Sequence, residues 1–348
     1  MQYKHLGSSG IQVSAICLGT MTFGEQNTQA EGHHQLDWAI EYGINFIDTA
    51  ELYAIPPKAE TYGRTEEIIG AWLSQRGRRD DLVIASKIAG AGADWIPHIR
   101  EGKTRFNAEN ITQALDASLK RLQTDYLDLY QLHWPERQTN YFGKLGYQQA
   151  DNEQALTPIR QTLEALENQV KAGKIRYIGL SNETPWGMMQ FLNIAKDYDL
   201  PKIVSVQNPY SLINRTYEVG CAEISHREDV GLLAYSPLGF GVLSGKYLND
   251  ARPENARITK WPEYGRYINT QAVAATEAYV KLANENELDP AQMALAYVNS
   301  RPFVASTIIG ATTMAQLKNN ITSIQLELDE NIITAIDNIH KQYPSPAP

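Results

Sequence analysis

The sequence predicts an α/β fold, a (β/α)8 TIM barrel with an N-terminal β-hairpin and long βα loops. Eight short apolar runs alternate with amphipathic stretches, which is the order of a parallel sheet built from βα units. Most runs are nearly continuous in Ile, Val and Leu, as strands covered on both faces require. The 348 residues fit one barrel, so we expect a single domain over residues 1–348.

The eight candidate strands are, in order, Ala15–Leu18, Ile44–Asp48, Leu82–Lys87, Leu127–His133, Ile175–Ser181, Ile203–Gln207, Gly231–Ser236 and Ser306–Ile309. Between them apolar residues recur at helical spacing. One such helix is followed by Gly173 as a stop, and it carries Leu156, Ile159, Leu163, Leu166 and Val170. Asn107 is a candidate N-cap for a second helix, which carries Ile111, Leu115, Leu119 and Leu122. A third helix is expected from near His34 to Gly43.

An open, doubly wound sheet is the structural alternative to the closed barrel. The first βα turn, Gly19–Gly24, lacks the GxGxxG pattern that such a sheet uses to approach a pyrophosphate. Ahead of the first strand, Gln2–Leu6 and Ile11–Val13 flank a Gly-Ser-Ser-Gly turn, which predicts a hairpin covering the bottom of the barrel. The proline-rich segment 343–348 is expected to be a loose tail.

The composition excludes several classes of function. The net charge is −9 and neither sign forms a block, which disfavours a nucleic-acid surface and a polybasic membrane anchor. No apolar run reaches the length of a spanning helix, and the N-terminus lacks the apolar region of a signal peptide. Cys17 and Cys221 are far apart, so we expect free thiols and a cytoplasmic protein. A catalytic cysteine is the alternative. An oligomer is possible but not implied.

Three connecting segments, Ala89–Phe106, Trp134–Gln154 and Leu238–Thr270, exceed ordinary βα loop length. All three follow the carboxyl ends of predicted strands, where barrel enzymes place their active sites. We therefore expect these loops to surround a binding site.

Polar residues end six of the predicted strands. They are Asp48, Lys87, His133, the pair Ser181 and Asn182, Gln207, and the pair Tyr235 and Ser236. For any single strand, the alternative is that the polar residue only marks the point where the buried strand ends. Six different functional groups at equivalent positions favour a shared mouth lined by reactive side chains.

Four of these groups suit carbonyl reduction. The Tyr53 phenol is a weak acid, and a nearby Lys87 ammonium would lower its pKa. Asp48 would serve as the counter-ion of Lys87. His133 would orient a carbonyl oxygen or relay a proton, although a histidine that is merely buried in the barrel is the alternative. Such a set protonates an oxygen as negative charge develops on it. The sequence shows no metal-ligand spacing, so no metal is implied and the hydride must come from an organic cofactor.

The chain resembles the aldo-keto reductases over nearly its whole length, in Leu18–Gly24, Gly43–Ala50, Tyr126–Leu129, Gly173–Asn182 and Tyr235–Gly239. The order and spacing of Asp48, Tyr53, Lys87 and His133 are similar to that family's catalytic tetrad. Within the family the chain most resembles the bacterial Tas-type proteins, also in an insertion with Tyr141, Phe142 and Tyr147, and the related β subunits of voltage-gated potassium channels. Those β subunits carry an amide where His133 stands, so His133 favours ordinary reductase chemistry.

The resemblance also implies an NADP(H) site. Ser181, Asn182 and Gln207 would bind the nicotinamide carboxamide, and Tyr235 would stack on its ring. Lys246 and Arg257 would neutralise the 2′-phosphate, unless they are only solvated loop cations. The other implied cofactor residues are Thr20, Met21, Ser236, Pro237, Leu238, Gly239, Gly241, Ser244, Gly310, Thr312, Gln316, Asn319 and Asn320. For Asn319 and Asn320 the alternative is two amides on a helix surface.

Two other functions fit parts of this pattern. One is a regulatory module that binds NADPH with little turnover. The other is a Schiff-base aldolase with Lys87 as nucleophile, which the neighbouring Asp48 disfavours because it stabilises the charged amine. The expected partner is a small carbonyl compound, and Phe23, Trp95, Trp134 and Tyr141 predict an aromatic lining for its pocket.

Overall fold

The computed structural model describes residues 1–92, 94–149 and 156–348, and its centre is a closed barrel of eight parallel strands. The strand order is β10-β3-β4-β5-β6-β7-β8-β9, so each strand pairs with its sequence neighbours and β10 closes against β3. The predicted barrel is confirmed. The bounds are β3 Ile16–Gly19, β4 Phe46–Asp48, β5 Val83–Ile88, β6 Leu127–Leu132, β7 Ile175–Ser181, β8 Ile203–Pro209, β9 Gly231–Tyr235 and β10 Val304–Ile309.

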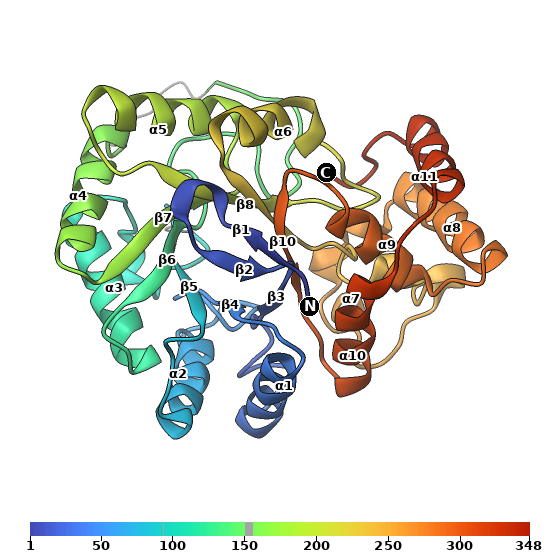
Figure 1. Cartoon of the computed structure of the whole chain (residues 1–348), viewed down its shortest axis with the longest axis horizontal. Helices are drawn as coiled ribbons and strands as arrows, with labels where there is room; N and C mark the ends of the chain where they lie inside the picture. Colours follow the sequence, from blue (N-terminus) through green and yellow to red (C-terminus); the bar gives the residue numbers. More distant parts are fainter. Residues whose placement is uncertain (93, 150–155) are drawn as a thin grey trace.

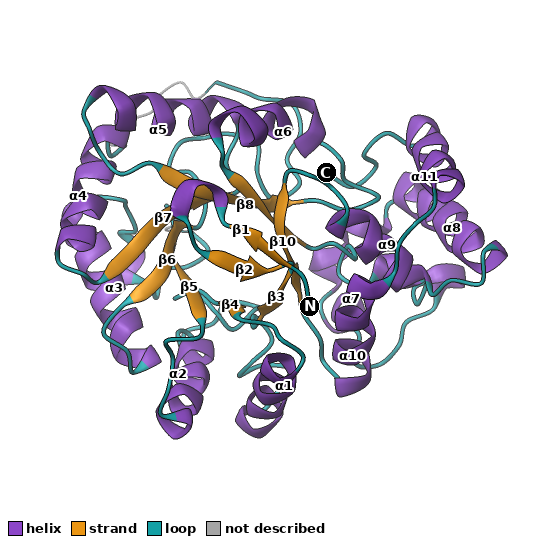
Figure 2. Cartoon of the chain, in the orientation of Figure 1, coloured by secondary structure: helices purple, strands orange, loops and turns teal. Residues whose placement is uncertain are grey.

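Helices surround the barrel (Figures 1 and 2). Asn107 caps α3 as expected, because its side chain accepts a hydrogen bond from the Asn110 amide at 2.9 Å. Helix α1 begins before His34, since Thr28 and Glu31 form a capping box. The bounds are α1 Gln29–Glu41, α2 Arg64–Arg76, α3 Ala108–Leu122, α4 Ile159–Lys171, α5 Pro185–Asp197, α6 Tyr217–Glu228, α7 Arg257–Lys260, α8 Thr270–Glu285, α9 Pro290–Asn299, α10 Met314–Thr322 and α11 Glu330–Gln342.

The predicted hairpin covers one end of the barrel, where it lies in front of the strands in Figure 1. It consists of β1 (Tyr3–His5) and β2 (Gln12–Ser14), which pair antiparallel. Leu6 is fully buried against apolar residues that fill the barrel interior. Gly7 adopts a left-handed φ of 49°, and a Cβ there would lie 2.2 Å from the Val204 carbonyl oxygen. Only glycine allows this close approach to the start of β8.

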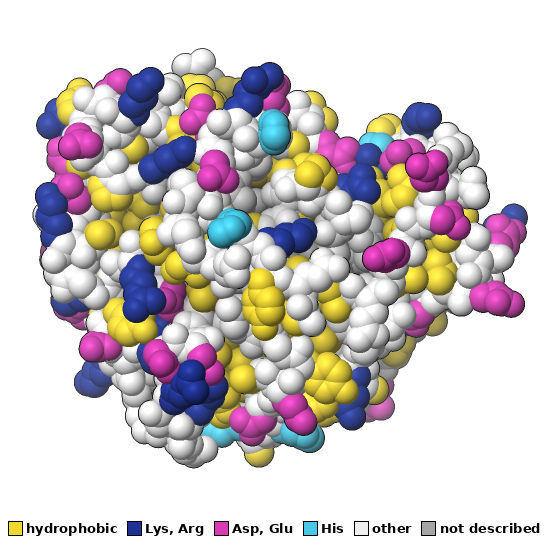
Figure 3. Space-filling model, in the orientation of Figure 1, with side chains coloured by type: hydrophobic (Ala, Val, Ile, Leu, Met, Phe, Trp, Pro, Cys, Tyr) yellow, Lys and Arg dark blue, Asp and Glu magenta, His cyan; other side chains and the backbone are white. Residues whose placement is uncertain are grey.

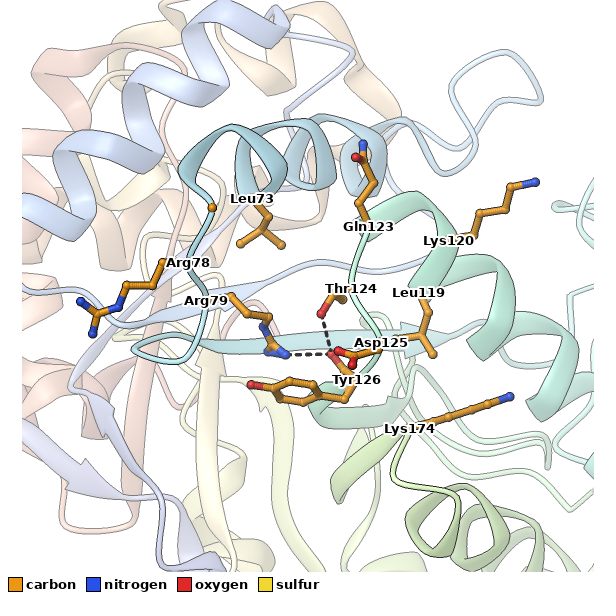
Figure 4. Close-up of a pocket in the computed structure, with 11 residues that line it drawn as sticks. Leu73, Arg78, Arg79, Leu119, Lys120, Gln123, Thr124, Asp125, Tyr126 and Lys174 are labelled. Atoms are coloured by element: carbon orange, nitrogen blue, oxygen red, sulfur yellow. Dashed lines mark hydrogen bonds between the residues drawn. The ribbon is translucent and has the colours of Figure 1, made fainter.

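The hairpin end of the molecule carries interspersed charges of both signs (Figure 3). A shallow hollow of about 790 Å³ also lies among the turns that lead into β5, β6 and β7 (Figure 4). In it Arg79 and Thr124 donate hydrogen bonds to the Tyr126 carbonyl oxygen, and Leu73 and Leu119 supply apolar walls. The hollow lies at the strand starts, opposite the polar strand ends.

No helix in the described part of the chain is long and apolar enough to cross a membrane.

The proline-rich tail is docked, and the expectation of a loose segment is wrong. Ala347 is buried, and its amide donates a hydrogen bond to the Ile213 carbonyl oxygen at 3.0 Å. The Ser345 hydroxyl accepts from the Arg215 amide, and the Pro346 carbonyl oxygen accepts from the Asn269 side chain. Proline prevents a helix here, but it leaves carbonyl and side-chain oxygens free to make contacts with distant segments.

Candidate active site

The ends of β4 and β5 bring Asp48 and Lys87 together. Asp48 pairs with Ala85 in the barrel register, which places it beside the strand that carries Lys87. The fully buried Lys87 ammonium donates to Asp48 Oδ2 at 2.6 Å and to the Thr49 carbonyl oxygen at 2.8 Å. The same nitrogen lies 3.4 Å from the Tyr53 hydroxyl. Three of the four polar residues expected to act together are therefore in direct contact.

Two glutamines hold the other oxygen of Asp48. Gln207 Nε2 donates to Oδ1 at 2.8 Å, and Gln131 Nε2 donates to it at 3.1 Å. The two glutamines also bond to each other at 3.1 Å. Gln131 was missed in the sequence analysis, although an amide inside a buried strand is an unusual feature that signals a polar partner. The carboxylate of Asp48 is fully engaged, which fixes the position of Lys87.

His133 also packs against Tyr53. The two rings meet edge to face with centroids 5.7 Å apart, and the backbone oxygen of His133 accepts a bond from Asn182. Burial, together with the positive charge of Lys87, holds the pKa of His133 well below its usual range. The imidazole is therefore neutral near pH 7. Its buried Nδ1 has no hydrogen-bond partner among the described residues.

The pKa of Tyr53 moves in the direction opposite to the one expected from Lys87 alone. Burial raises the pKa of this phenol, and the nearby Lys87 opposes the rise without cancelling it. Burial likewise acts to lower the pKa of Lys87, but Asp48 and Tyr53 outweigh it, so the pKa of the ammonium ends above its ordinary value. Near neutral pH the site thus holds a protonated phenol beside a charged ammonium. This pair can donate a proton and stabilise the phenolate that remains.

Glu51 links the Tyr53 segment to the long loop that follows β5. Its carboxylate is fully buried and makes a bidentate pair with Arg100 at 2.7 and 2.8 Å. It also accepts from the Ala89 amide at 2.7 Å and from the Tyr62 hydroxyl at 3.0 Å. The sequence analysis did not identify Glu51 as a site residue. Its position between Asp48 and Tyr53 could have indicated a role in holding this segment. Four hydrogen bonds from three segments fix the backbone that carries Tyr53.

The residues expected around a nicotinamide lie at the rim formed by β7, β8 and β9. The Tyr235 hydroxyl donates to Asn182 Oδ1 at 2.6 Å, and Asn182 Nδ2 bonds to the Ser181 hydroxyl at 3.1 Å. Ser181 in turn donates to the Gln207 backbone oxygen at 2.9 Å. The Gln207 amide nitrogen is committed to Asp48 and Gln131. Thr20 lies elsewhere on the barrel mouth, at the ends of β3 and β4, where its hydroxyl donates to the Asp48 carbonyl oxygen at 2.8 Å.

The segment after β9 has the backbone and the charges that suit a phosphate ligand. Ser236, Gly239 and Gly241 have positive φ angles, which lets consecutive amides turn toward one side. Lys246 and Arg257 follow, and burial lowers the pKa of both, with Arg257 adding to the effect on Lys246. No carboxylate of the described residues lies within 4.0 Å of either cation. Two neighbouring cations without an acidic partner fit a multiply charged anion.

The remaining expected cofactor residues surround the start of α10. Thr312 bonds to Gln316 through its amide and its hydroxyl, and Asn320 Nδ2 donates to the Gly310 carbonyl oxygen at 3.2 Å. Asn319 points elsewhere, because its amide group bonds to Gln292 and Asp289 at the start of α9. The N-terminus of a helix generally suits an anion, but here the amides of Thr312 and Gln316 already have side-chain partners, and Asn319 is occupied by a structural contact.

Comparison with known proteins agrees with this fold and arrangement. The sequence matches the aldo/keto reductase family over residues 15–341, so the chain belongs to that family and is an oxidoreductase. It is 54% identical to Protein tas of Escherichia coli K12, with both chains covered in full. It is 33% identical to the uncharacterized oxidoreductase YrpG of Bacillus subtilis, covering 99% of this chain and 97% of the relative. A probable voltage-gated potassium channel subunit beta of Arabidopsis thaliana is 32% identical, covering 94% and 92%.

Proposed function

We propose that this protein reduces an aldehyde or ketone to an alcohol with NADPH, using Asp48, Tyr53, Lys87 and His133 as its catalytic residues. The observation that carries the proposal is the Lys87 ammonium, which lies 2.6 Å from Asp48 and 3.4 Å from the Tyr53 hydroxyl. A buried ion pair that only stabilised the fold would not require a phenol hydroxyl within reach of its ammonium. NADPH, when bound, supplies the hydride.

Each residue has a distinct part in this reaction. Tyr53 donates its proton to the carbonyl oxygen as negative charge develops there. Lys87 stabilises the resulting phenolate through its charge, and Asp48 keeps Lys87 protonated and oriented. The neutral imidazole of His133 donates a hydrogen bond that orients the carbonyl oxygen. His133 is a poor proton source at neutral pH, because burial holds its pKa so low.

The cations of the segment after β9 support NADPH rather than NADH. The two cofactors differ only in the 2′-phosphate, so selectivity requires positive charge at that group. Lys246 and Arg257 provide such charge without an acidic partner among the described residues. Burial lowers the pKa of Lys246, and repulsion by Arg257 lowers it further. A bound phosphate would relieve this repulsion. We assign the pair to the 2′-phosphate.

The expected substrate pocket is aromatic on one side. Trp134 follows His133, and its ring lies 5.0 Å from Trp95 and 5.8 Å from Phe142, each on a different long loop. These rings suit an apolar or aromatic carbonyl compound, which they would shield from water. Both cysteines are buried free thiols, which supports a cytoplasmic location for the reaction.

The test is steady-state oxidation of NADPH in the presence of a reactive aldehyde, methyl 4-formylbenzoate, with NADH in a parallel series. We expect turnover with both cofactors and a lower KM for NADPH. Tight NADPH binding with no detectable turnover of any aldehyde would instead indicate a nucleotide-binding regulatory module. The absence of NADPH binding would rule out both functions.

A further inference from the structure

Arg266 is a half-buried cation that forms no ion pair within the described part of the chain. It lies in the 3-10 helix Pro262–Ile268, within the long segment between β9 and α8. Its Nη2 donates to the Tyr267 hydroxyl at 2.5 Å, and its guanidinium carbon lies 4.6 Å from the centre of the Tyr267 ring. The buried Nε has no hydrogen-bond partner, and no carboxylate lies within 4.0 Å of the guanidinium, in residues 1–92, 94–149 and 156–348. An unpaired guanidinium in such a site is costly unless a ligand supplies the missing charge.

Three segments meet at Arg266. A Cβ placed on Gly143, in the loop that follows β6, would lie 3.2 Å from Arg266 Cδ and 3.3 Å from the main-chain oxygen of Pro348, the last residue of the sequence. The residue before Gly143 is Phe142, which packs against Trp134 beside His133. The guanidinium therefore stands where the loop after β6, the loop after β9 and the docked tail surround the polar strand ends.

Arg266 also acts on Tyr235, at the end of β9. Burial raises the pKa of the Tyr235 hydroxyl, and the neighbouring guanidinium opposes that rise. Tyr235 is bonded to Asn182, which is bonded to the backbone of His133. Arg266 is thus close to the group that would carry the nicotinamide, on the side of the loop that holds Phe142.

Arg266 lies on the same Phe240 ring as Arg257, since their guanidinium carbons are 5.8 and 4.7 Å from its centre. Unlike Arg257, however, Arg266 also contacts Tyr267 and lies beside Gly143, in the loop that carries Phe142. A guanidinium bordered by aromatic rings recognises a planar carboxylate, because its parallel N–H groups match the two oxygens.

We propose that Arg266 determines substrate specificity by binding a carboxylate carried by the carbonyl substrate, so that the preferred substrates are oxo-acids. The proposal rests on the proposed carbonyl reduction. It assigns a substrate class that the catalytic residues alone leave open, since they contact only the reacting carbonyl group.

The experiment compares two aldehydes that differ only in charge, 4-formylbenzoate and its methyl ester, with saturating NADPH. The wild-type kcat/KM should favour 4-formylbenzoate about 10- to 100-fold, the range expected for a hydrogen-bonded charged contact. Arg266→Met should abolish the preference by raising the KM for 4-formylbenzoate. The kcat/KM for the ester should change less than about 3-fold. Arg266→Lys should restore part of it, because the charge returns without the planar fork. Arg252→Met, an exposed arginine in the same segment, is the matched control and should keep the full preference.

Three results would overturn the inference: no preference in the wild-type protein, a preference that survives in Arg266→Met, or an equal loss of both substrates with a lower melting temperature. The last result would show that Arg266 only anchors the loops. Binding of the product alcohol, 4-(hydroxymethyl)benzoate, to the protein with NADP⁺ tests the same contact without turnover. If neither aldehyde is reduced but this binding depends on Arg266, the proposed reaction fails while the carboxylate site stands.

Discussion

The Lys87 ammonium lies 3.4 Å from the Tyr53 hydroxyl, and both groups are buried. Burial raises the pKa of the phenol, whereas the lysine charge opposes that rise. The phenol therefore keeps its proton in the resting protein and loses it most easily when a developing oxyanion is present to accept it. This relationship makes Lys87 important for chemistry rather than for cofactor affinity.

Replacing Lys87 with methionine should lower kcat on the order of 10²-fold or more, because the Tyr53 phenolate loses its stabilising charge. The pKa of Tyr53 should rise further. NADPH affinity, from a fluorescence titration, should change less than about 3-fold. Because the variant leaves Asp48 unpaired, it should also lose stability, roughly 3–5 kcal/mol. The double variant Asp48→Asn/Lys87→Met should regain stability but not activity. A pH–rate profile identical to that of the wild type would refute the lysine–tyrosine coupling.

Changing Lys246 and Arg257 to alanine together should weaken NADPH binding far more than NADH binding. The lost contacts are charge-assisted bonds to a phosphate, so a decrease in NADPH affinity of about 100-fold is expected, with NADH changed less than about 5-fold. The measurement is the Kd of each cofactor. The exposed cations Arg252 and Lys260 of the same segment provide a matched double-alanine control. Equal losses for the two cofactors would show that the phosphate site is assigned wrongly.

His133 should make the protein less stable in acid. Its folded pKa is held well below the usual 6.5 by burial and Lys87, so below pH 6.5 the unfolded chain takes up a proton that the folded protein refuses. The contribution is fully present above pH 6.5 and is lost as the pH falls, by up to about 1.4 kcal/mol per pH unit. Between pH 7.5 and 5.0, His133→Asn should therefore lose less free energy of unfolding than the wild type in urea unfolding. The exposed His226→Asn should lose as much as the wild type, and the same loss in His133→Asn would disprove the neutral imidazole.

The Glu51–Arg100 pair should account for a large part of local stability, since both side chains are buried. Glu51→Gln leaves the guanidinium without its counter-ion and should cost roughly 3–5 kcal/mol in urea unfolding. The double variant Glu51→Gln/Arg100→Gln should be less destabilised than the sum of the single changes. The exposed pair Glu223–Arg227 is the control, where Glu223→Gln should cost less than about 1 kcal/mol. Additive effects at Glu51 and Arg100 would show that the two residues are not coupled.

The sequence patterns predicted the barrel because its strands are short, apolar and separated by helical spacing. The strand ends are then close by necessity, since parallel register aligns the carboxyl ends of β4, β5 and β6. Local sequence patterns did not predict features that depend on contacts between residues far apart in the sequence. The proline-rich tail is docked through Ala347, and Gln131 on β6 reaches Asp48 on β4, two strands away. The pKa of Tyr53 was expected to fall, because the sequence reveals a neighbouring charge but not the degree of burial that outweighs it.

Replacing Tyr53 with phenylalanine is the most direct test of Tyr53 as the proton donor, because it removes the hydroxyl and leaves the ring. We expect a loss of kcat on the order of 10³-fold for methyl 4-formylbenzoate, with unchanged NADPH affinity and melting temperature. Tyr130→Phe is the matched control, since this buried hydroxyl on β6 has no hydrogen-bond partner in the described part of the chain. It should retain full activity. If Tyr53→Phe keeps more than about a tenth of wild-type turnover with chemistry rate-limiting, Tyr53 is not the acid.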